Sequence, residues 1–310
     1  MILCLNLNAA IDKTIVVSSF EINRIHRPES VIALAGGKGA NVARALKTLG
    51  DTPVVSGWVG GFSGEFIENA LHLEGMQTDF IHTDFESRTC TSILDREKQT
   101  MTEIYELSES VPLEKINELR DHIRVIIGKY KAITLSGSLP TGVPTNFYAD
   151  LISIARKENV LTFLDTSGDA LRKGVEAGPF FIKPNETEVK AILGIGSSDN
   201  FDSAQAAAEI SKRYGTNVLL SLGADGAIAA NTAEIFRVKN SRVDAKSAVG
   251  SGDCMLAGLT HGFLRGLSFE EAVICGVAAG TANTLMMGAG QFKIEDYERL
   301  HGQVRSNRIK

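Results

Sequence analysis

Short β-rich runs alternate with helical stretches along most of the chain, and this alternation constrains the fold more than any other feature of the sequence. The strand-like runs are residues 2–7, 53–58, 132–135, 161–165, 180–183, 217–221 and 226–230. The helix-like runs are residues 40–49, 64–74, 113–130, 145–157, 202–214, 253–265 and 269–285. Strands that alternate with helices pair in parallel and are covered on both faces. We therefore predict an α/β fold with three layers, built on a doubly wound and mainly parallel sheet.

Two segments interrupt the alternation, residues 14–34 and 88–106. Both are extended and lack helical periodicity, so they predict either a small antiparallel sheet that projects from the main body or ordinary hairpins at a sheet edge. A projecting sheet could act as a lid that closes over a site, or as a dimer surface. The chain has no internal repeat and no linker-like change in composition, so we expect one domain over residues 1–310 plus this lid.

Composition and charge exclude several classes of protein. Apolar residues make up 44% of the 310 and charged residues 22%, which excludes a disordered or fibrous chain. The net charge of −5 gives no overall basic field, so we expect no nucleic-acid partner, although a local pocket for a small anion is compatible with it. Residues 272–290 carry no charge, but their many glycine, threonine and asparagine side chains favour a helix packed on the sheet over a membrane span.

The cysteines and the N-terminal residues indicate the cellular compartment. The four cysteines lie far apart, with no C-x-x-C pair and no zinc-like spacing, which favours a reducing compartment. The N-terminal residues lack a basic segment and alternate apolar with polar side chains, as a strand does and a signal peptide does not. We therefore expect a cytoplasmic protein.

The strongest single motif is the segment 247–253, Ser-Ala-Val-Gly-Ser-Gly-Asp, which opens a helical run. Glycines at a loop-to-helix junction let backbone N–H groups converge, and the helix N-terminus favours an anion, most naturally a phosphate. Asp253 has two interpretations that do not exclude each other. It could cap the helix, or it could be a general base that takes a proton from an acceptor hydroxyl while Gly250, Ser251 and Gly252 stabilise a phosphoryl group in transfer.

A second glycine-rich turn, residues 35–44, also opens a helix and carries Gly37, Lys38 and Asn41. It suits the close approach of a polyhydroxy or phosphorylated ligand, and the alternative is a plain turn. Asp12 follows the first strand and could accept hydrogen bonds from substrate hydroxyls or serve as a turn residue. The common nucleotide motifs are missing, because a dinucleotide fingerprint starting at Gly250 would need glycine where Met255 stands and no segment fits a Walker loop.

Two further segments follow predicted strands. Asn185 and Glu188 are three residues apart, so in a first helical turn they share a face and can hold hydrated Mg²⁺, or they can simply cap the helix. Residues 221–226 connect two strand-like runs and form either a hairpin loop or a cover for a nucleotide.

These segments, together with residues 8–12 and 136–140 and in this order along nearly the whole chain, resemble the ribokinase-like carbohydrate kinases. The resemblance is to the phosphofructokinase B branch, which phosphorylates sugar phosphates. By this resemblance Asp253 matches the catalytic base, and the anion hole is formed by Gly250, Ser251 and Gly252. The ATP-binding positions match Lys183, Asn185, Ser221, Gly223 and Gly226. The Mg²⁺ element matches Asn185 and Glu188, and the sugar-contacting positions match Asp12, Gly37, Lys38 and Asn41.

The resemblance also points to the acceptor. Lys38, Arg88 and Ser138 match positions that hold the acceptor's phosphate, and their character suits a dianion; for Arg88 a solvated surface position is the alternative. We predict an ATP- and Mg²⁺-dependent kinase of a ketohexose monophosphate. Our first choice of acceptor is fructose 1-phosphate, because residues 12–14 and the turn at 36–42 look most like those of 1-phosphofructokinases. Our second choice is tagatose 6-phosphate or fructose 6-phosphate.

More distant alternatives are a kinase of a non-phosphorylated sugar or nucleoside, and a non-catalytic sugar-phosphate sensor. The complete anion loop together with Asp253 disfavours the sensor, because binding alone needs no base. The resemblance further implies a homodimer formed through the lid, and it leaves a monovalent-cation requirement open.

Overall fold

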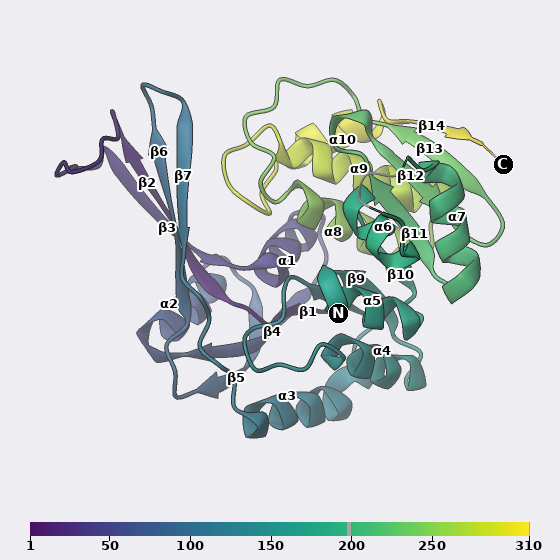
Figure 1. Cartoon of the computed structure of the whole chain (residues 1–310), viewed down its shortest axis with the longest axis horizontal. Helices are drawn as coiled ribbons and strands as arrows, with labels where there is room; N and C mark the ends of the chain where they lie inside the picture. The colour runs from purple at the N-terminus through teal and green to yellow at the C-terminus, as the bar shows by residue number, and fades with distance from the viewer. Residues whose placement is uncertain (197–199, 310) are drawn as a thin grey trace.

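The structure is a computed structural model that describes residues 1–196 and 200–309. Within these residues one large sheet has ten strands, in the spatial order β14-β13-β12-β11-β10-β9-β8-β1-β4-β5 (Figure 1). Their bounds are β1 Ile2–Asn6, β4 Pro53–Gly60, β5 Gln77–Thr83, β8 Ala132–Ser136, β9 Leu161–Asp165, β10 Phe181–Ile182, β11 Asn217–Ser221, β12 Ala227–Ala230, β13 Ile235–Lys239 and β14 Arg305–Arg308. The pairings from β5 to β11 are parallel, and those of β12, β13 and β14 are antiparallel.

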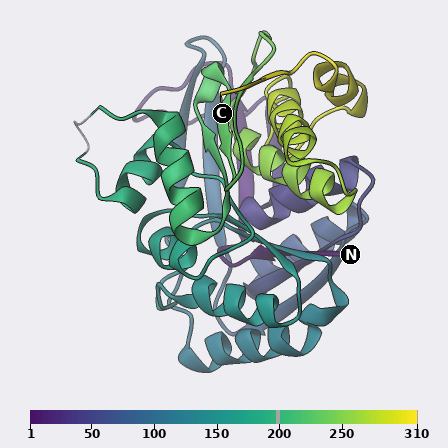
Figure 2. The same cartoon turned by 90° about the vertical axis from the view of Figure 1, so that its right-hand side faces the viewer.

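Helices cover both faces of this sheet, as Figure 2 shows in edge view. One face carries α1 (Lys38–Thr48), α2 (Gly61–Leu73), α8 (Ser251–Leu264), α9 (Phe269–Asn283) and α10 (Ile294–His301). The other carries α3 (Leu113–Ile126), α4 (Phe147–Lys157), α5 (Gly168–Glu176), α6 (Glu186–Leu193) and α7 (Ser203–Tyr214). Short 3₁₀ turns, η1 (Ile127–Lys129) and η2 (Gly223–Asp225), complete the elements. The three-layer α/β prediction is confirmed.

The side chains of β1 explain why this strand is wholly buried. Ile2 and Cys4 point into the core on the α1 face, and Leu3 and Leu5 point into the core on the α3 face. A strand covered on both faces has apolar residues at successive positions, because neither face meets water. The central strands therefore form a rigid platform whose ends can hold polar side chains in fixed places.

The uncharged segment at 272–290 contains most of α9, which packs along α8 and is buried at nearly every position. Its small residues allow this close approach; a Cβ added at Gly276 would come within 2.7 Å of the Leu259 side chain. Among residues 1–196 and 200–309, none of the helices has the length and apolar character that crossing a bilayer requires.

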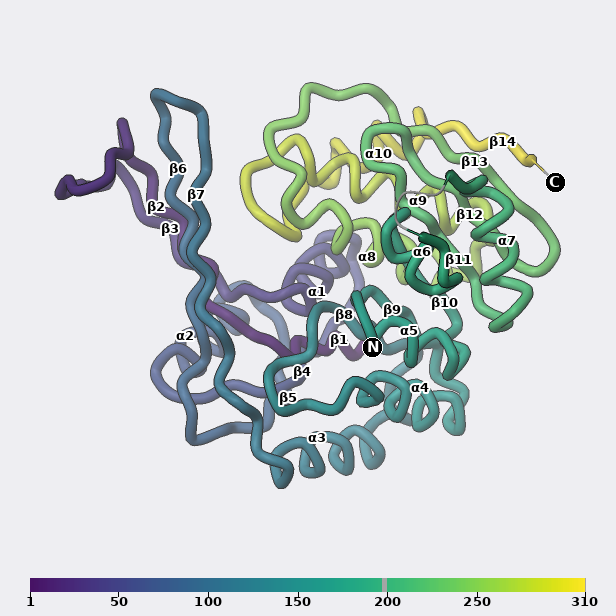
Figure 3. The backbone as a smooth tube through the Cα atoms, in the orientation of Figure 1, coloured from purple at the N-terminus to yellow at the C-terminus, as the bar shows by residue number. Residues whose placement is uncertain are grey.

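The two extended segments form the predicted small sheet, which projects from the main body as a long ribbon (Figure 3). Its strands are β2 (Ala10–Val17), β3 (Ser30–Gly36), β6 (Arg88–Asp95) and β7 (Thr100–Tyr105), in the order β3-β2-β6-β7. The two outer pairings are antiparallel, but the central pairing of β2 with β6 is parallel. A hairpin joins neighbours in sequence, whereas β2 and β6 come from different parts of the chain, so their relative direction is set by where each leaves the large sheet.

Candidate active site

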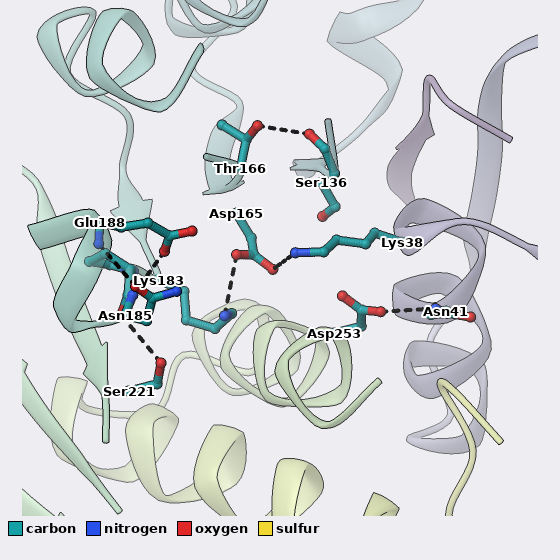
Figure 4. Close-up of polar contacts among 12 residues, drawn as sticks. Lys38, Asn41, Ser136, Asp165, Thr166, Lys183, Asn185, Glu188, Ser221 and Asp253 are labelled. Atoms are coloured by element: carbon teal, nitrogen blue, oxygen red, sulfur yellow. Dashed lines mark hydrogen bonds and ion pairs between the residues drawn. The ribbon is translucent and has the colours of Figure 1, made fainter. Parts of the chain in front are cut away.

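The candidate residues gather at the carboxyl edge of the parallel strands. Asn6, Ser136 and Asp165 are the last residues of neighbouring strands β1, β8 and β9, and Lys183 directly follows β10. The N-terminal ends of α1, α6 and α8 meet the same edge, as the close-up in Figure 4 shows. In open parallel sheets this edge is where ligands bind.

Glycine shapes the turn that begins α8. Gly250 is the N-cap of the helix, with a left-handed φ of 80°. A Cβ at this position would lie 2.6 Å from the Cα of Ala289, so any side chain would displace the loop at 289–290. Asp253 lies three residues further, inside the first turn, and no side chain caps this helix. The capping interpretation of Asp253 is therefore wrong, because the backbone of Gly250 occupies the cap position.

Asp253 is a buried carboxylate with one defined partner. It is 5% exposed, and its Oδ2 accepts a hydrogen bond of 2.9 Å from Nδ2 of Asn41. Burial raises the pKa of Asp253 to about 6, against the opposing effect of the Lys38 ammonium. A carboxylate with a pKa in this range is ionised near neutral pH yet basic enough to accept a proton, as a general base must.

Two lysines lie beside this carboxylate and are joined by Asp165, an aspartate that no sequence motif singled out. Nζ of Lys38 lies 3.3 Å from Oδ2 of Asp165, and Nζ of Lys183 lies 3.3 Å from its Oδ1 (Figure 4). Asp165 is 4% exposed. Burial alone would lower the pKa of Lys38, but the carboxylates of Asp165 and Asp253 raise it above its ordinary value. Lys38 is therefore held as a cation beside Asp165 and Asp253.

Asp165 had one signal in the sequence, its position as the last residue of a predicted strand. The carboxyl end of a parallel strand is where site residues are expected. Its two partners lie 127 and 18 positions away, and no local pattern indicates such pairings.

The Asn185–Glu188 pair forms a capping box at the start of α6. Oδ1 of Asn185 accepts from the Glu188 N–H, and Oε2 of Glu188 accepts from the Asn185 N–H, both at 2.9 Å. The capping interpretation is thus confirmed. Burial raises the pKa of Glu188, and the Asp165 carboxylate raises it further, against the hydrogen bond from Asn185. In the described part of the chain, His, Cys, Asp and Glu side chains do not form a metal-binding group of three or more.

A cavity of about 160 Å³ lies between the lid and the main body. Residues from both parts line it, among them Asp12, Asn41, Arg44, Tyr105 and Val249. Asp12 lies within β2 and not in a turn, which corrects that alternative. Burial raises the pKa of Asp12, and the guanidinium groups of Arg88 and Arg44 oppose the rise. Asp12 and Asn41 therefore contribute a carboxylate and an amide to the lining of this cavity.

The turn before α1 approaches this region through Gly37. Its φ is 100°, and a Cβ there would collide with the Asn6 side chain, so the position requires glycine. Gly37 also donates its N–H toward Asp12. The interpretation of residues 35–44 as a turn that opens a helix is confirmed.

Arg88 and Ser138 are brought together by Asn8. Nδ2 of Asn8 donates to Oγ of Ser138 at 3.1 Å, and the Asn8 carbonyl accepts from Nη2 of Arg88 at 3.4 Å. The Nε of Arg88 is buried and has no hydrogen-bond partner within the described residues. Arg88 is partly exposed, its Nη1 donates to the Glu106 carbonyl at 3.3 Å, and its buried Nε retains an unused donor. The alkyl chain of Lys38 lies beside Gly137, the residue before Ser138.

A larger cavity of about 610 Å³ lies on the other side of the 247–252 segment. Ser221, Gly223, Ser251 and Gly252 are among its lining residues. The hairpin interpretation of residues 221–226 is confirmed, since β11 and β12 pair in antiparallel fashion across η2. Gly226 is buried at the end of this turn, and the residues that line the cavity do not include it.

Lys183 and Asn185 lie next to this cavity. Nζ of Lys183 is 3.2 Å from the point where a Cβ of Gly252 would stand, and Asn185 forms an isolated parallel bridge with Ser221. Both residues thus adjoin the wall formed by Ser221 and Gly252.

Comparison with known proteins identifies the family. The pfkB family carbohydrate kinase model matches residues 5–296. The chain is 29% identical over 309 residues to the tagatose-6-phosphate kinase of Staphylococcus epidermidis, with 98% of each chain covered. The structure of phosphofructokinase-2 from Escherichia coli in complex with potassium matches with a TM-score of 0.90 and 26% identity, over 98% of each chain. Another structure of that enzyme is its tetrameric inhibited form.

A third relative has a similar fold. The protein named Possible 1-phosphofructokinase from Thermotoga maritima matches with a TM-score of 0.88 and 25% identity, over 100% of both chains. The family match spans nearly the whole chain and includes every motif from which the kinase was predicted. The prediction is confirmed: the chain belongs to the pfkB family of carbohydrate kinases and is an enzyme that transfers a phosphate group.

Proposed function

We propose that this enzyme transfers the γ-phosphoryl group of ATP to a hydroxyl of a ketohexose monophosphate. The observation that carries the proposal is the position of Asp253 at the start of α8, where the chain separates two cavities. Val249 lines the smaller cavity beneath the lid, and Ser251 and Gly252 line the larger one. An acceptor in the smaller cavity and ATP in the larger would meet at a helix N-terminus, which favours phosphate.

The residues at this junction suit each part of the transfer. Asp253 takes the proton of the acceptor hydroxyl, whose oxygen forms a bond to the γ-phosphorus as the bond to ADP breaks. The backbone N–H groups of Gly250 and Gly252 stabilise charge on the phosphoryl oxygens, and that of Ser251, which donates to the Ala248 carbonyl at 3.2 Å, would turn to the phosphoryl group as well. Lys183, 8% exposed at its side chain and beside Gly252, adds a fixed positive charge.

Mg²⁺ fits the edge beside α6, because the half-buried Glu188 faces the Asp165 carboxylate and a cation would relieve their repulsion. Asn185 and Glu188 would hold the ion through water, since their side chains are occupied by the capping box. Bound Mg²⁺ would neutralise charge on the ATP phosphates. The potassium complex of the E. coli relative supports testing a monovalent cation as well.

The phosphate of the acceptor would bind to Lys38, Arg88 and Ser138. These three residues are not among those that line the smaller cavity, so the acceptor would reach beyond it, past Asp12, which the Arg88 guanidinium faces. The buried, unpartnered Nε of Arg88 supports this assignment, because a phosphate oxygen would satisfy it. Within this class we propose fructose 1-phosphate first, on the sequence of residues 12–14 and 36–42. Tagatose 6-phosphate is the second candidate, supported by the S. epidermidis relative, and fructose 6-phosphate follows.

We also propose that two copies associate through the lid and that the enzyme works in the cytoplasm. Val31, Ile32 and Ile104 are exposed on the small sheet, where a second copy could cover them. The four cysteines are buried and free, as expected in a reducing compartment. Light scattering would show a dimer that the substitution Ile32→Glu dissociates, and a monomeric wild type would contradict the lid assignment.

The decisive experiment measures ADP release from ATP and Mg²⁺ with fructose 1-phosphate, tagatose 6-phosphate, fructose 6-phosphate and the corresponding free sugars. Phosphorus NMR then identifies which carbon of the product bears the new phosphate. We expect turnover with a phosphorylated ketohexose and little with a free sugar. Preference for a free sugar or nucleoside would refute the acceptor class, and tight binding of phosphosugars without ADP release would indicate a sensor.

A further inference from the structure

Arg44 is a buried arginine that the proposed mechanism does not use, and its guanidinium donates hydrogen bonds to three residues, Ala35, Asn41 and Glu74. It lies on α1 and is 8% exposed. Nε and Nη2 donate to the two carboxylate oxygens of Glu74, at 2.5 and 3.0 Å, and Nη2 also donates to the carbonyl of Ala35 at 2.8 Å. Nη1 donates to Oδ1 of Asn41 at 3.2 Å.

The bond to Asn41 fixes which way round its amide lies. An arginine can only donate hydrogen bonds, so the atom of Asn41 that meets Nη1 is the oxygen. An ionised carboxylate can only accept, so the atom that meets Oδ2 of Asp253 is the amide nitrogen. If the amide were reversed, its oxygen would face the carboxylate and its NH₂ group would face the guanidinium. Hydrogen bonds link Glu74, Arg44, Asn41 and Asp253 in a row, and the carboxylates at its two ends allow the Asn41 amide only one orientation.

This orientation distinguishes the two oxygens of Asp253. Oδ2 is occupied by the Asn41 amide, while Oδ1 has no hydrogen bond from the described residues. Oδ1 is thus the atom available to an incoming hydroxyl. In Figure 4, Asn41 approaches the carboxylate from α1, on the side away from Lys183.

We propose that Arg44 is a positioning residue for phosphoryl transfer, because it holds the Asn41 amide on Oδ2 of Asp253 and so leaves Oδ1 to take the proton. This inference rests on the proposed role of Asp253 as the base. In the step, the acceptor O–H bond breaks and its proton goes to Oδ1, and the hydroxyl oxygen bonds to the γ-phosphorus. The bond from that phosphorus to the bridging oxygen breaks, and its electron pair leaves with ADP.

The charges around the carboxylate set the direction of the effect. Asp253 faces Lys38 on α1, Asp165 at the end of β9 and Lys183 after β10, and Cys254 follows it on α8. The hydrogen bond from Asn41 stabilises the ionised carboxylate and lowers its pKa against the larger effect of burial. An amide that is free to turn no longer donates reliably to Oδ2, so removal of Arg44 should make Asp253 harder to ionise.

Arg44 also carries a charge of its own, which must be separated from its effect on the amide. It faces Asp12 and Cys254 as well as Glu74. A double-mutant cycle makes the separation, because an effect through Asn41 disappears once the amide is gone, whereas an effect of charge remains.

The test is a carbon-13 NMR titration of the Asp253 carboxyl in the full-length protein without substrate, for wild type, Arg44→Met, Asn41→Ala and the double variant. We expect each single substitution to raise the titration midpoint by about one pH unit, and the double variant to match Asn41→Ala. An unchanged midpoint in Arg44→Met, or additive shifts in the double variant, would overturn the proposal. If Arg44→Met does not fold, Arg44→Lys takes its place in the cycle, because it keeps a cation opposite Glu74.

A matched control exists on the opposite face of the sheet. On α3, Nη2 of Arg120 donates to Oδ1 of Asn117 at 2.7 Å, with the same three-residue spacing as Asn41 and Arg44. Arg120→Met should leave the titration midpoint of Asp253 unchanged. A shift equal to that of Arg44→Met would mean that both substitutions act by general destabilisation. The titration needs no turnover, so it remains informative if no phosphosugar is accepted, and a failure of the proposed function is thereby distinguished from a failure of this inference.

Discussion

Replacement of Asp253 by asparagine should abolish most of the activity while making the protein more stable. The substitution keeps the size of the side chain and removes its ability to accept a proton, so kcat should fall about 10²- to 10⁴-fold. ATP binding should be retained, because the backbone N–H groups at the start of α8 are unaffected. The same substitution removes a buried carboxylate from a site where it is 5% exposed.

The gain in stability follows from the direction of the pKa change. Burial raises the pKa of Asp253 from 3.8 to about 6, so the folded protein holds this proton more tightly than the unfolded chain. The stabilisation is therefore complete below pH 4 and is lost as the pH rises through 6. At pH 8 the ionised Asp253 lowers the free energy of unfolding by at most about 3 kcal/mol relative to an uncharged side chain. Asp253→Asn should accordingly unfold at a higher urea concentration at pH 8, and the difference should shrink toward pH 4.

Two assays on the same preparations check both halves of this prediction. Steady-state ADP release gives kcat and its pH profile, in which the wild-type rate should fall below about pH 6 as Asp253 takes up a proton. Urea unfolding at pH 4 and pH 8 gives the free energies, and calorimetry confirms ATP binding. A variant within tenfold of wild-type kcat would remove Asp253 as the base. A variant that loses both activity and stability at pH 8 would indicate that the carboxylate is structural.

Three other substitutions test the surrounding site. Arg88→Ala should raise the Michaelis constant for the phosphosugar about 10- to 100-fold with a smaller change in kcat, since it removes charge-assisted hydrogen bonds; an unchanged constant would favour a non-phosphorylated acceptor. Asp165→Asn should lower the free energy of unfolding by about 1–3 kcal/mol in urea titrations. Most of this loss should come from Lys183, whose buried side chain would lose its partner, and less from Lys38, which is half-exposed. A variant as stable as wild type would show that these two ion pairs contribute no net stability. Gly250→Ala should destabilise by about 1–3 kcal/mol and lower kcat, because its φ of 80° and the contact with Ala289 leave no room for a side chain; normal kcat would show that the loop adapts.

The parallel sheet was predictable because its strands carry their own signals. The predicted runs at 53–58, 161–165 and 217–221 correspond to β4, β9 and β11. The missed strands lie mainly at the edges of the sheet. β14 has the sequence Arg-Ser-Asn-Arg, and its polar residues give no strand pattern; it forms because β13 offers unpaired backbone groups.

The helix α5 was missed for a related reason. It spans nine residues, Gly168–Glu176, and contains two glycines, so its intrinsic helix propensity is low. Leu171 and Val175 are buried against the sheet, and this packing supplies what the local sequence does not. Short helices of this kind depend on tertiary contacts that a single sequence does not display.

The same distinction applies to the candidate site: features set by residues close in sequence could be predicted, and contacts between residues far apart in sequence could not. The turns at 35–44 and 247–253 could be predicted from their glycines, because the backbone conformations of these turns depend on residues that are adjacent in sequence. The bridge between Lys38, Asp165 and Lys183 was not visible, since it joins three strand and helix ends that only the folded sheet brings together. Whether a polar residue at a strand end is solvated or buried is decided by its neighbours in space.

The charge arrangement at this edge bears on how a near-neutral chain would bind the polyanions of the proposed reaction. The net charge is −5, yet Lys38 and Lys183 converge on one buried aspartate beside the glycine turn that begins α8. Asp165 fixes both ammonium groups, and its own charge compensates only part of theirs. Asp253, whose pKa burial has raised, stays ionised near neutral pH, so Asp165 and Asp253 together offset both ammonium charges, and Mg²⁺ would supply the further positive charge that the phosphates of the proposed reaction need. In the proposed reaction a base and a phosphate site can coexist within one helical turn, because Lys38 and Lys183, which would attract the phosphate, also oppose the protonation of Asp253.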